Sequence, residues 1–412
     1  MSKTIYVYFD DSYSKAPALI GMLSAQLARG REVFSFEFNN DWLHDNRCHL
    51  LDPDLQLFSG RQYLPENKSS FGLFLDSSPD RWGRVLLERR ESCRAKAENR
   101  PRQNLHESDF LLGVFDESRM GALRMKTSPN GEFLDNDLEY STPPFASLRE
   151  LENAAWQLEN DDNKDVSKWL KMLIAPGSSL GGARPKANVT DANGDLWIAK
   201  FPSRNDRKNV GAWEAVTMSL AKQCGIQVAP FNAKKLKNKY LTFLTKRFDR
   251  AEHNKRIHFT SAMTMLGYTD GNTQGCSYLE LFEWIANNCC EVEKNLAEMW
   301  LRIVFNIAVS NCDDHLRNHG FLLTPNGWTL SPAYDLNPVE YGTGLNLNIN
   351  EYENTLDFSL AIEVAPYAGI PKDEANKAVQ HTKEIVSQWR RVATSYQIPR
   401  EEQEMMSPAF KV

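Results

Sequence analysis

Residues 311–318 read N-C-D-D-H-L-R-N and follow M-W-L-R-I-V-F-N-I-A-V-S at 299–310, where apolar residues recur at helical spacing. Residues 320–330 read G-F-L-L-T-P-N-G-W-T-L, two apolar runs around a Pro-Asn-Gly turn, which predicts a β-hairpin. The second run leads into S-P-A-Y-D at 331–335. Because the two ends of a hairpin lie side by side, Asn318 and Asp335 are expected to approach each other.

The spacing within this stretch indicates phosphoryl transfer. Asp313 and Asn318 are five positions apart, as in the D-x-x-x-x-N catalytic loop of protein kinases, where the aspartate orients or deprotonates a hydroxyl and the asparagine binds Mg²⁺. An amide at 318 and a carboxylate at 335 suit a hard cation that bridges phosphates. A capped helix end at 313–315 and a metal hydrolase are the alternatives. A single His315 without H-x-x-x-H or C-x-x-C nearby argues against zinc.

A glycine-rich segment upstream could hold an anion. Residues 175–186 read A-P-G-S-S-L-G-G-A-R-P-K, in which Gly177, Gly181 and Gly182 would let backbone N–H groups approach a phosphate closely. The segment is not a Walker A loop, because no G-K-[S/T] follows. On glycine content alone, an ordinary surface loop remains an alternative.

The residues after this loop favour the phosphate interpretation. Residues 186–190 and 196–201 form a predicted hairpin around D-A-N-G-D, and Lys200 shares a strand face with apolar neighbours. Glu214 follows within a predicted helix that ends at Gly225. A glycine loop, a strand lysine and a helix glutamate occur in this order in protein kinases, where the lysine holds phosphates and the glutamate positions it. A snorkelling lysine and a solvated glutamate would be the plain alternative.

Composition excludes several classes of protein. The chain has 412 residues, 48 Lys plus Arg and 54 Asp plus Glu, so its formal net charge is 48 − 54 = −6. A net negative chain is a poor candidate for binding DNA by itself. Hydrophobic residues make up 42%, enough to build a core. Seven cysteines without a C-x-x-C pair favour neither a disulfide framework nor a zinc ribbon. With no leader-like or membrane-length apolar run, a cytoplasmic protein is expected.

The chain changes character along its length. The first 125 or so residues predict mixed strands and helices, including a helix that begins at S-S-P-D-R-W (77–82) and an exposed loop at 94–104. Residues 126–144 suggest a linker, 147–172 a helix, and 173–250 short strands with turns. From about residue 255 onward, long apolar-periodic stretches predict a mainly helical region.

Taken together, these motifs resemble the HipA-like serine/threonine kinase toxins of bacterial toxin–antitoxin systems. The matching stretches are S-S-L-G-G-A-R-P-K, W-I-A-K-F-P, L-T-K-R-F-D-R, N-C-D-D-H-L-R-N and S-P-A-Y-D-L-N-P, with L-D-S-S-P-D-R-W-G-R and R-M-G-A-L-R before them. The resemblance implies an α+β, two-lobed protein-kinase-like fold. Its expected parts are an added α/β N-terminal subdomain at 1–130, an N-lobe-like region at 131–250 and a helical C-lobe at 251–412.

The resemblance also assigns roles by position. It implies that Asp313 is the catalytic base, that Asn318 and Asp335 bind Mg²⁺, and that the segment 246–248 is the adenine hinge. Ser179, or the adjacent Ser178, would be autophosphorylated, and the added charge would repel the nucleotide and inactivate the enzyme. The residues expected to contact ATP are Gly181, Gly182, Ala183, Arg184, Lys186, Lys200, Glu214, Lys246, Phe248 and His315.

The family further implies a small helix-turn-helix antitoxin encoded nearby, which would supply the basic DNA-reading surface that this acidic chain lacks. Protein substrates in the family include aminoacyl-tRNA synthetases, and no residue here specifies the target. Two other functions stay open: a kinase-like co-repressor that acts mainly by binding the antitoxin on operator DNA, and a small-molecule or lipid kinase. The intact set of Lys200, Asp313, Asn318 and Asp335 argues against an inactive kinase.

Overall fold

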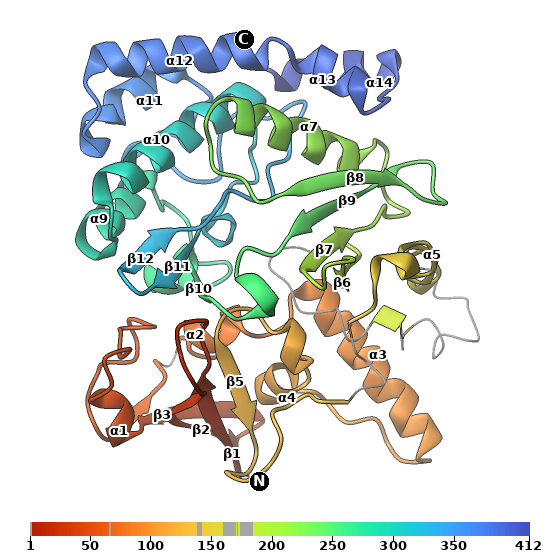
Figure 1. Ribbon diagram of the computed structural model, residues 1–412, viewed down its shortest axis with the longest axis vertical. Helices are drawn as coiled ribbons and strands as arrows, with labels where there is room; N and C mark the ends of the chain where they lie inside the picture. The colour runs from red at the N-terminus through yellow and green to blue at the C-terminus, as the bar shows by residue number, and fades with distance from the viewer. Residues whose placement is uncertain (1, 66, 138–141, 160–169, 171, 174–183) are drawn as a thin grey trace. The chain divides into compact units, whose positions relative to one another are not determined.

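The structure is a computed structural model that describes residues 2–65, 67–137, 142–159, 170, 172–173 and 184–412 (Figure 1). The chain forms two compact units. The first comprises residues 1–203 and 249–269, and the second comprises 204–248 and 270–412. Each unit is therefore built from two separate stretches of sequence. These boundaries differ from the three-part division at 130/131 and 250/251, which stays a prediction.

The first unit contains an antiparallel sheet with strand order β4-β3-β2-β1-β5. Burial alternates along β1, where Ile5, Val7 and Phe9 are buried, because successive side chains of a strand point to opposite faces. The apolar run at 5–9 and the period-two alternation at 33–38 lie within β1 and β3. The strands are β1 (Ser2–Phe9), β2 (Ala18–Ala28), β3 (Arg31–Phe38), β4 (Arg61–Tyr63) and β5 (Leu123–Lys126).

Helix α3 (Arg81–Ala97) begins where the Ser-Pro-Asp signal predicted a helix. The side chain of Asp80 accepts a hydrogen bond from the backbone N–H of Gly83 at 2.8 Å and caps the helix. The helix runs to Ala97, so the predicted loop at 94–104 begins about one turn later than expected. The other helical segments of this unit are α1 (Asn40–Leu43), α2 (Gly72–Asp76), α4 (Glu107–Leu112), η1 (Asp116–Ser118), η3 (Phe145–Ser147), α5 (Leu148–Leu158), η4 (Glu252–Asn254) and α8 (Ala262–Met265).

The stretch 249–269 is fastened to the rest of the first unit by polar contacts. Asp249 accepts a hydrogen bond from the backbone N–H of Gly121 at 2.9 Å. Arg250 and Arg256 both donate to the backbone carbonyl of Arg119, at 2.7 and 3.1 Å. These contacts join residues more than 120 positions apart in the sequence, and they are buried. The unit also contains β10 (His258–Ser261) and the predicted hairpin of β6 (Lys186–Thr190) and β7 (Leu196–Lys200).

The second unit is mainly helical, as predicted for the C-terminal half. Its core packs α7 (Val210–Gln223) and α10 (Val292–Val309) against α12 (Lys372–Val386) and α13 (Trp389–Ser395) (Figure 1). Trp389 stacks on Phe410 with ring centroids 4.3 Å apart, which ties the C-terminal segment to this core. The remaining helical segments are α9 (Tyr278–Asn288), η5 (Leu316–Asn318), α11 (Phe358–Val364), η6 (Ala365–Ala368), α14 (Arg400–Met406) and η7 (Ser407–Ala409).

Two hairpins complete the second unit. Strand β11 (Gly320–Thr324) pairs antiparallel with β12 (Gly327–Leu330) through the predicted Pro-Asn-Gly turn. Gly327 has φ of +116°, a backbone conformation that side-chain-bearing residues rarely adopt. Strands β8 (Phe231–Lys235) and β9 (Leu241–Lys246) pair antiparallel, and the basic run at 234–239 covers the end of β8 and the residues that follow it. Among the described residues, no helix is both long and apolar enough to cross a lipid bilayer.

Candidate active site

The loop that carries Asp313 and Asn318 follows directly on α10 in the second unit. Ser310 ends the helix with φ of 49°, so the chain turns sharply before residue 313. The side-chain amide of Asn318 donates to the backbone carbonyl of Asp313 at 2.9 Å, and the backbone N–H of Asn318 donates to His315 at 2.8 Å. These bonds close the loop on itself. They leave Asp313 at the surface and Asn318 buried at 3% exposure.

The segment that carries Asp335 lies beside this loop. The backbone N–H of Ser331 donates to the carbonyl of Gly320 at 2.8 Å, and the Tyr334 hydroxyl donates to the carbonyl of Arg317 at 2.6 Å. Asp335 itself has φ of 60°, in the left-handed region that non-glycine residues seldom occupy. Such backbone conformations persist only where surrounding contacts enforce them, and they are concentrated at functional sites.

The electrostatics of Asp313 reflect these neighbours. Partial burial of its carboxyl raises the pKa of Asp313, and nearby His315 lowers it in part. The negative charges of Asp335 and Asp314 raise the pKa further. Asp335 therefore lies close enough to Asp313 for its charge to affect the pKa of Asp313. A carboxylate whose pKa is raised toward the working pH is a better proton acceptor than one in bulk water.

The oxygen atoms at this site fit a hard divalent cation. The side-chain oxygen Oδ1 of Asn318 is buried and has no hydrogen-bond partner among the described residues. Such an atom is costly to bury unless something else satisfies it, and a cation would do so. Asp335 would add a carboxylate oxygen, and Mg²⁺ commonly takes one or two protein ligands together with substrate phosphates. The described residues hold no cluster of three or more His, Cys, Asp or Glu side chains suited to a metal.

The predicted hinge reaches the same region. Lys246 ends β9, and its backbone N–H donates to the carbonyl of Pro230 at 2.8 Å. The ring of Phe248 packs against that of Tyr334, with centroids 5.4 Å apart. The segment 246–248 thus lies next to the residue that precedes Asp335. Its contact with adenine stays a prediction.

The predicted phosphate loop is only partly described. Ser178, Ser179, Gly181, Gly182 and Ala183 lie outside the described residues. Arg184 and Lys186 are described and belong to the first unit.

Lys186 occupies a buried position that sequence reasoning did not foresee. Its ammonium lies 2.7 Å from a carboxylate oxygen of Asp80, and both side chains are less than a tenth exposed. The indole N–H of Trp82 donates to the backbone carbonyl of Lys186 at 3.1 Å. Lys186 therefore anchors β6 to the start of α3, and the phosphate contact predicted for it would be additional to this anchoring.

Lys200 and Glu214 lie on the elements where they were expected. Lys200 ends β7, opposite Lys186 in the hairpin register, and is half-buried. Glu214 lies on α7 and is 2% exposed. The lysine belongs to the first unit and the glutamate to the second, so their ion pair stays a prediction.

Sequence reasoning missed a set of buried polar side chains that contact the loop at 311–318. Asp314 accepts hydrogen bonds from Tyr278, Asn306 and His319. The only signal in the sequence was the Asp-Asp pair at 313–314, and nothing local distinguishes the exposed member from the buried one.

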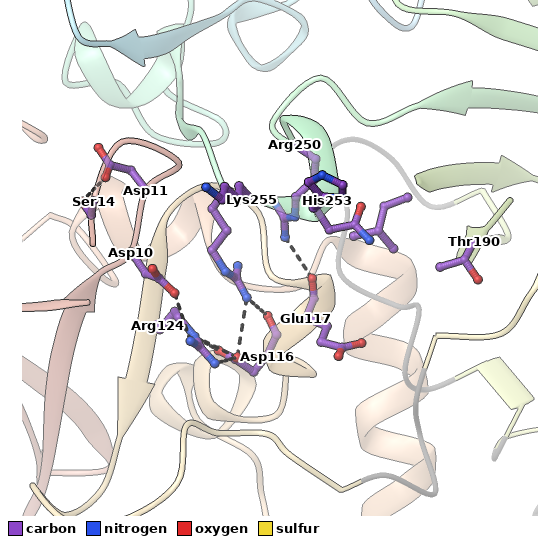
Figure 2. A pocket seen from close by; sticks show the side chains of 13 residues that line it. Asp10, Asp11, Ser14, Asp116, Glu117, Arg124, Thr190, Arg250, His253 and Lys255 are labelled. Atoms are coloured by element: carbon purple, nitrogen blue, oxygen red, sulfur yellow. Dashed lines mark hydrogen bonds and ion pairs between the residues drawn. The ribbon is translucent and has the colours of Figure 1, made fainter. Parts of the chain in front are cut away.

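A separate cavity of about 390 Å³ lies in the first unit, lined by charged side chains (Figure 2). In Figure 2, Arg124 points toward Asp10 and Asp116; its Nη1 lies 3.0 Å from Asp10 Oδ2, and its Nε lies 2.9 Å from Asp116 Oδ2. Arg250 donates to the backbone carbonyl of Glu117 at 2.9 Å. Arg124 thus pairs with two of the lining carboxylates, and none of the predicted site residues lines the cavity.

Comparisons with known proteins agree with this architecture. A solved structure of HipA from Shewanella oneidensis MR-1, in complex with HipB and operator DNA, is similar over 98% of this chain and 94% of that chain. Its TM-score is 0.65 at 18% identity, so the similarity concerns the fold. It confirms the predicted α+β, protein-kinase-like fold class.

Two curated relatives are similar in sequence over part of the chain. The serine/threonine-protein kinase toxin HipA of Shewanella oneidensis is 26% identical over 192 residues, 40% of this chain and 44% of the relative. A protein named putative kinase from Haemophilus influenzae is 28% identical over 183 residues, 39% of this chain and 52% of the relative. The chain thus matches about half the length of these relatives.

Every described candidate residue from Arg184 to Asp335 lies in a stretch that matches a family model. Residues 178–389 match the HipA-like C-terminal domain, which is slightly more than half of the chain. This match includes the loop at 311–318, the hairpin β11–β12 and the segment 246–248, whose geometry is described above. The chain therefore belongs to the HipA-like C-terminal domain family.

Proposed function

We propose that this protein is an ATP-dependent serine/threonine protein kinase that acts as the toxin of a toxin–antitoxin module. The observation that carries the proposal is the grouping of three side chains in the second unit. Asp313 is an accessible carboxylate with a raised pKa, and the charge of Asp335 is one cause of that rise. Asn318 has a buried side-chain oxygen without a hydrogen-bond partner among the described residues. The relatives named as kinases support the same chemistry.

In the proposed reaction, Asp313 orients the hydroxyl of a substrate serine or threonine and accepts its proton. The hydroxyl oxygen forms a bond to the γ-phosphorus of ATP as the bond from that phosphorus to the bridging oxygen breaks, and ADP leaves. Asn318 and Asp335 would hold Mg²⁺. When bound, the ion would neutralise charge on the phosphate oxygens. Phe248 and the neighbouring backbone would support the adenine, and Lys200 would contact the phosphates.

Two further features belong to the proposal. Self-inactivation would follow from phosphorylation of Ser179 or Ser178, because a phosphate placed in an anion-binding loop repels a second one. The partner would be a small helix-turn-helix antitoxin, by analogy with the Shewanella complex, which contains HipB and operator DNA. The antitoxin would then provide the DNA contacts.

The decisive experiment incubates the purified protein with Mg·ATP and follows phosphate by intact-protein mass spectrometry and peptide mapping. Wild type should gain phosphate at 178 or 179 and should label proteins in a host lysate. Asp313→Ala should abolish both while leaving the fold intact, because a surface carboxylate contributes little to packing. Asp373→Ala, an exposed aspartate on α12, is the matched control and should behave as wild type. Undiminished labelling by Asp313→Ala would refute the assigned base.

A further inference from the structure

Asp314 is a carboxylate buried directly beneath the catalytic loop. It is 1% exposed, and one of its oxygens, Oδ2, receives three hydrogen bonds. Asn306 Nδ2 and His319 Nε2 donate to it, each at 2.8 Å, and the Tyr278 hydroxyl donates as well. Burial and the neighbouring charge of Asp314 raise the pKa of Tyr278 well above its ordinary value, so the phenol keeps the proton that it donates. The donors come from α9, α10 and the residue before β11.

The position of these residues in the chain matters as much as their contacts. Asp314 is adjacent to Asp313, and His319 is adjacent to Asn318. The hydrogen bond between Asp314 and His319 therefore clamps the two ends of the loop that holds the proposed base and the proposed metal ligand. Both clamping side chains are almost fully buried, so the bond is shielded from competing water.

The network extends from the loop to Asp335. Asn311 Nδ2 donates to Asn306 Oδ1 at 3.1 Å, and the backbone N–H of Asn337 donates to Asn311 Oδ1 at 3.2 Å. The side-chain amide of Asn337 then donates to Asp335 Oδ1 at 3.2 Å. A continuous chain of buried or half-buried amides thus runs from the oxygen of Asp314 to that of the second proposed metal ligand.

We infer that Asp314 is a positioning residue: its buried carboxylate, held by Tyr278, Asn306 and His319, fixes Asp313, Asn318 and Asp335 in one geometry. The inference rests on the proposed kinase function. Asp314 does not itself serve as the base, because its Oδ2 is already occupied by three donors and the side chain is withdrawn from solvent. Catalytic groups must be held within about 0.5 Å of their working positions, and side chains packed behind them provide that precision.

The test compares variants that remove parts of the network while preserving shape. Asp314→Asn removes the charge, and Tyr278→Phe removes one donor. Tyr396→Phe is the matched control, because the Tyr396 hydroxyl is 3.0 Å from Ser219 Oγ in the same unit but outside the network. For each protein, calorimetry measures the affinity for a non-hydrolysable ATP analogue in EDTA and with Mg²⁺. Steady-state labelling gives kcat, and thermal unfolding gives Tm.

Asp314→Asn and Tyr278→Phe should lower kcat and the gain in nucleotide affinity due to Mg²⁺ by about 10- to 100-fold, the usual effect of losing a residue that supports a ligand. Affinity in EDTA should stay at the wild-type value, and Tyr396→Phe should change neither quantity. The inference would be overturned if both network variants kept the wild-type kcat and Mg²⁺ gain. Equal losses with and without Mg²⁺, in proportion to a fall in Tm that Tyr396→Phe shares, would also overturn it and indicate a merely structural role.

These measurements separate the inference from the proposed function. If wild type transfers no phosphate but binds the analogue with an Mg²⁺ gain that Asp314→Asn removes, the kinase proposal fails and the positioning role stands. If wild type transfers phosphate and the network variants match it, the kinase proposal stands and the positioning role fails. If wild type shows no Mg²⁺-dependent nucleotide binding, both are overturned.

Discussion

Two adjacent aspartates in one loop have opposite environments. Asp313 is accessible, and Asp314, one residue later, is buried under three hydrogen-bond donors. The difference lies in their partners, because Asp314 Oδ2 accepts hydrogen bonds from Tyr278, Asn306 and His319 in the interior, whereas Asp313 is exposed. Two side chains of the same type therefore have different proposed roles: Asp313 is the proposed base, and Asp314 is proposed to hold the loop in place.

Asp335 is proposed to bind Mg²⁺ through its carboxylate. Asp335→Asn should weaken binding of Mg·ATP by on the order of tenfold, about 1.4 kcal/mol, because a neutral amide is a poorer cation ligand than a carboxylate. Binding of ATP in EDTA should change little. Isothermal calorimetry with and without Mg²⁺ measures both affinities. Asp357→Asn is a suitable control, since Asp357 caps α11 and asparagine caps helices equally well. Equal losses with and without Mg²⁺ would contradict the assignment.

The candidate site illustrates what sequence can and cannot predict. The spacing of Asp313 and Asn318 and the Pro-Asn-Gly turn are local signals, and the hairpin β11–β12 formed where they indicated. The partners of Asp314 are not local, because Tyr278 and Asn306 are 36 and 8 positions away and come from different helices. Their convergence depends on how α9 and α10 pack, which no spacing rule within the loop expresses.

At the scale of elements, Lys186 and Asp80 join β6 to α3. Both carboxylate oxygens of Asp80 have partners. Oδ1 accepts a hydrogen bond from the backbone N–H of Gly83, and Oδ2 lies 2.7 Å from the Lys186 ammonium. Burial raises the pKa of Asp80, and the charge of Lys186 opposes that rise. The sequence predicted the helix start at Ser-Pro-Asp and the strand at 186. It could not predict their contact, because 106 positions separate the two residues.

This ion pair predicts a specific pattern of stabilities. Lys186→Met should lower the free energy of unfolding by about 3–5 kcal/mol, because it leaves the Asp80 carboxylate buried without the ammonium group that now pairs with it. Adding Asp80→Asn should restore part of the loss, since asparagine removes the charge and still caps α3. Urea denaturation of the two single variants and the double variant provides the cycle. Additive losses in the double variant would argue against direct coupling.

At the scale of the whole molecule, a buried histidine links stability to pH. His258 on β10 is 1% exposed and packs against Phe9 with ring centroids 5.3 Å apart. Burial, and then the nearby His49, lowers the pKa of His258 from 6.5 to about 3. Between these values the unfolded chain binds a proton at this position and the folded chain does not. His258 therefore lowers the free energy of unfolding as pH falls from 6.5 toward 3. Above pH 6.5 this effect of His258 is absent.

His258→Leu should remove this pH dependence. The difference in unfolding free energy between wild type and variant should change by about 1.4 kcal/mol per pH unit below pH 6.5, with the variant gaining relative stability in acid. Denaturant titrations at several pH values measure it, and other titrating groups cancel in the difference. A difference that stays constant with pH would mean that His258 is not held neutral in the fold.

The net charge gives another prediction for the whole chain. With 48 basic and 54 acidic side chains, the protein alone should bind duplex DNA only weakly at about 0.15 M salt, because few phosphates could be neutralised. Fluorescence anisotropy with labelled DNA from its own promoter region measures the affinity, with and without the proposed helix-turn-helix antitoxin. Tight, strongly salt-dependent binding by this chain alone would contradict the proposed division of labour.

The interrupted first unit has a consequence for synthesis on the ribosome. The sheet β1–β5 is translated by residue 126, but Arg250 and Arg256, which bond the carbonyl of Arg119, come more than 120 residues later. At about 5–20 residues per second, the nascent sheet waits on the order of ten seconds for these partners. During that interval the carbonyl of Arg119 lacks the two arginine donors that it has in the complete fold. We therefore expect the nascent chain to be more sensitive to proteases than the complete protein until residue 256 has been synthesised, which is before the loop at 311–318 exists.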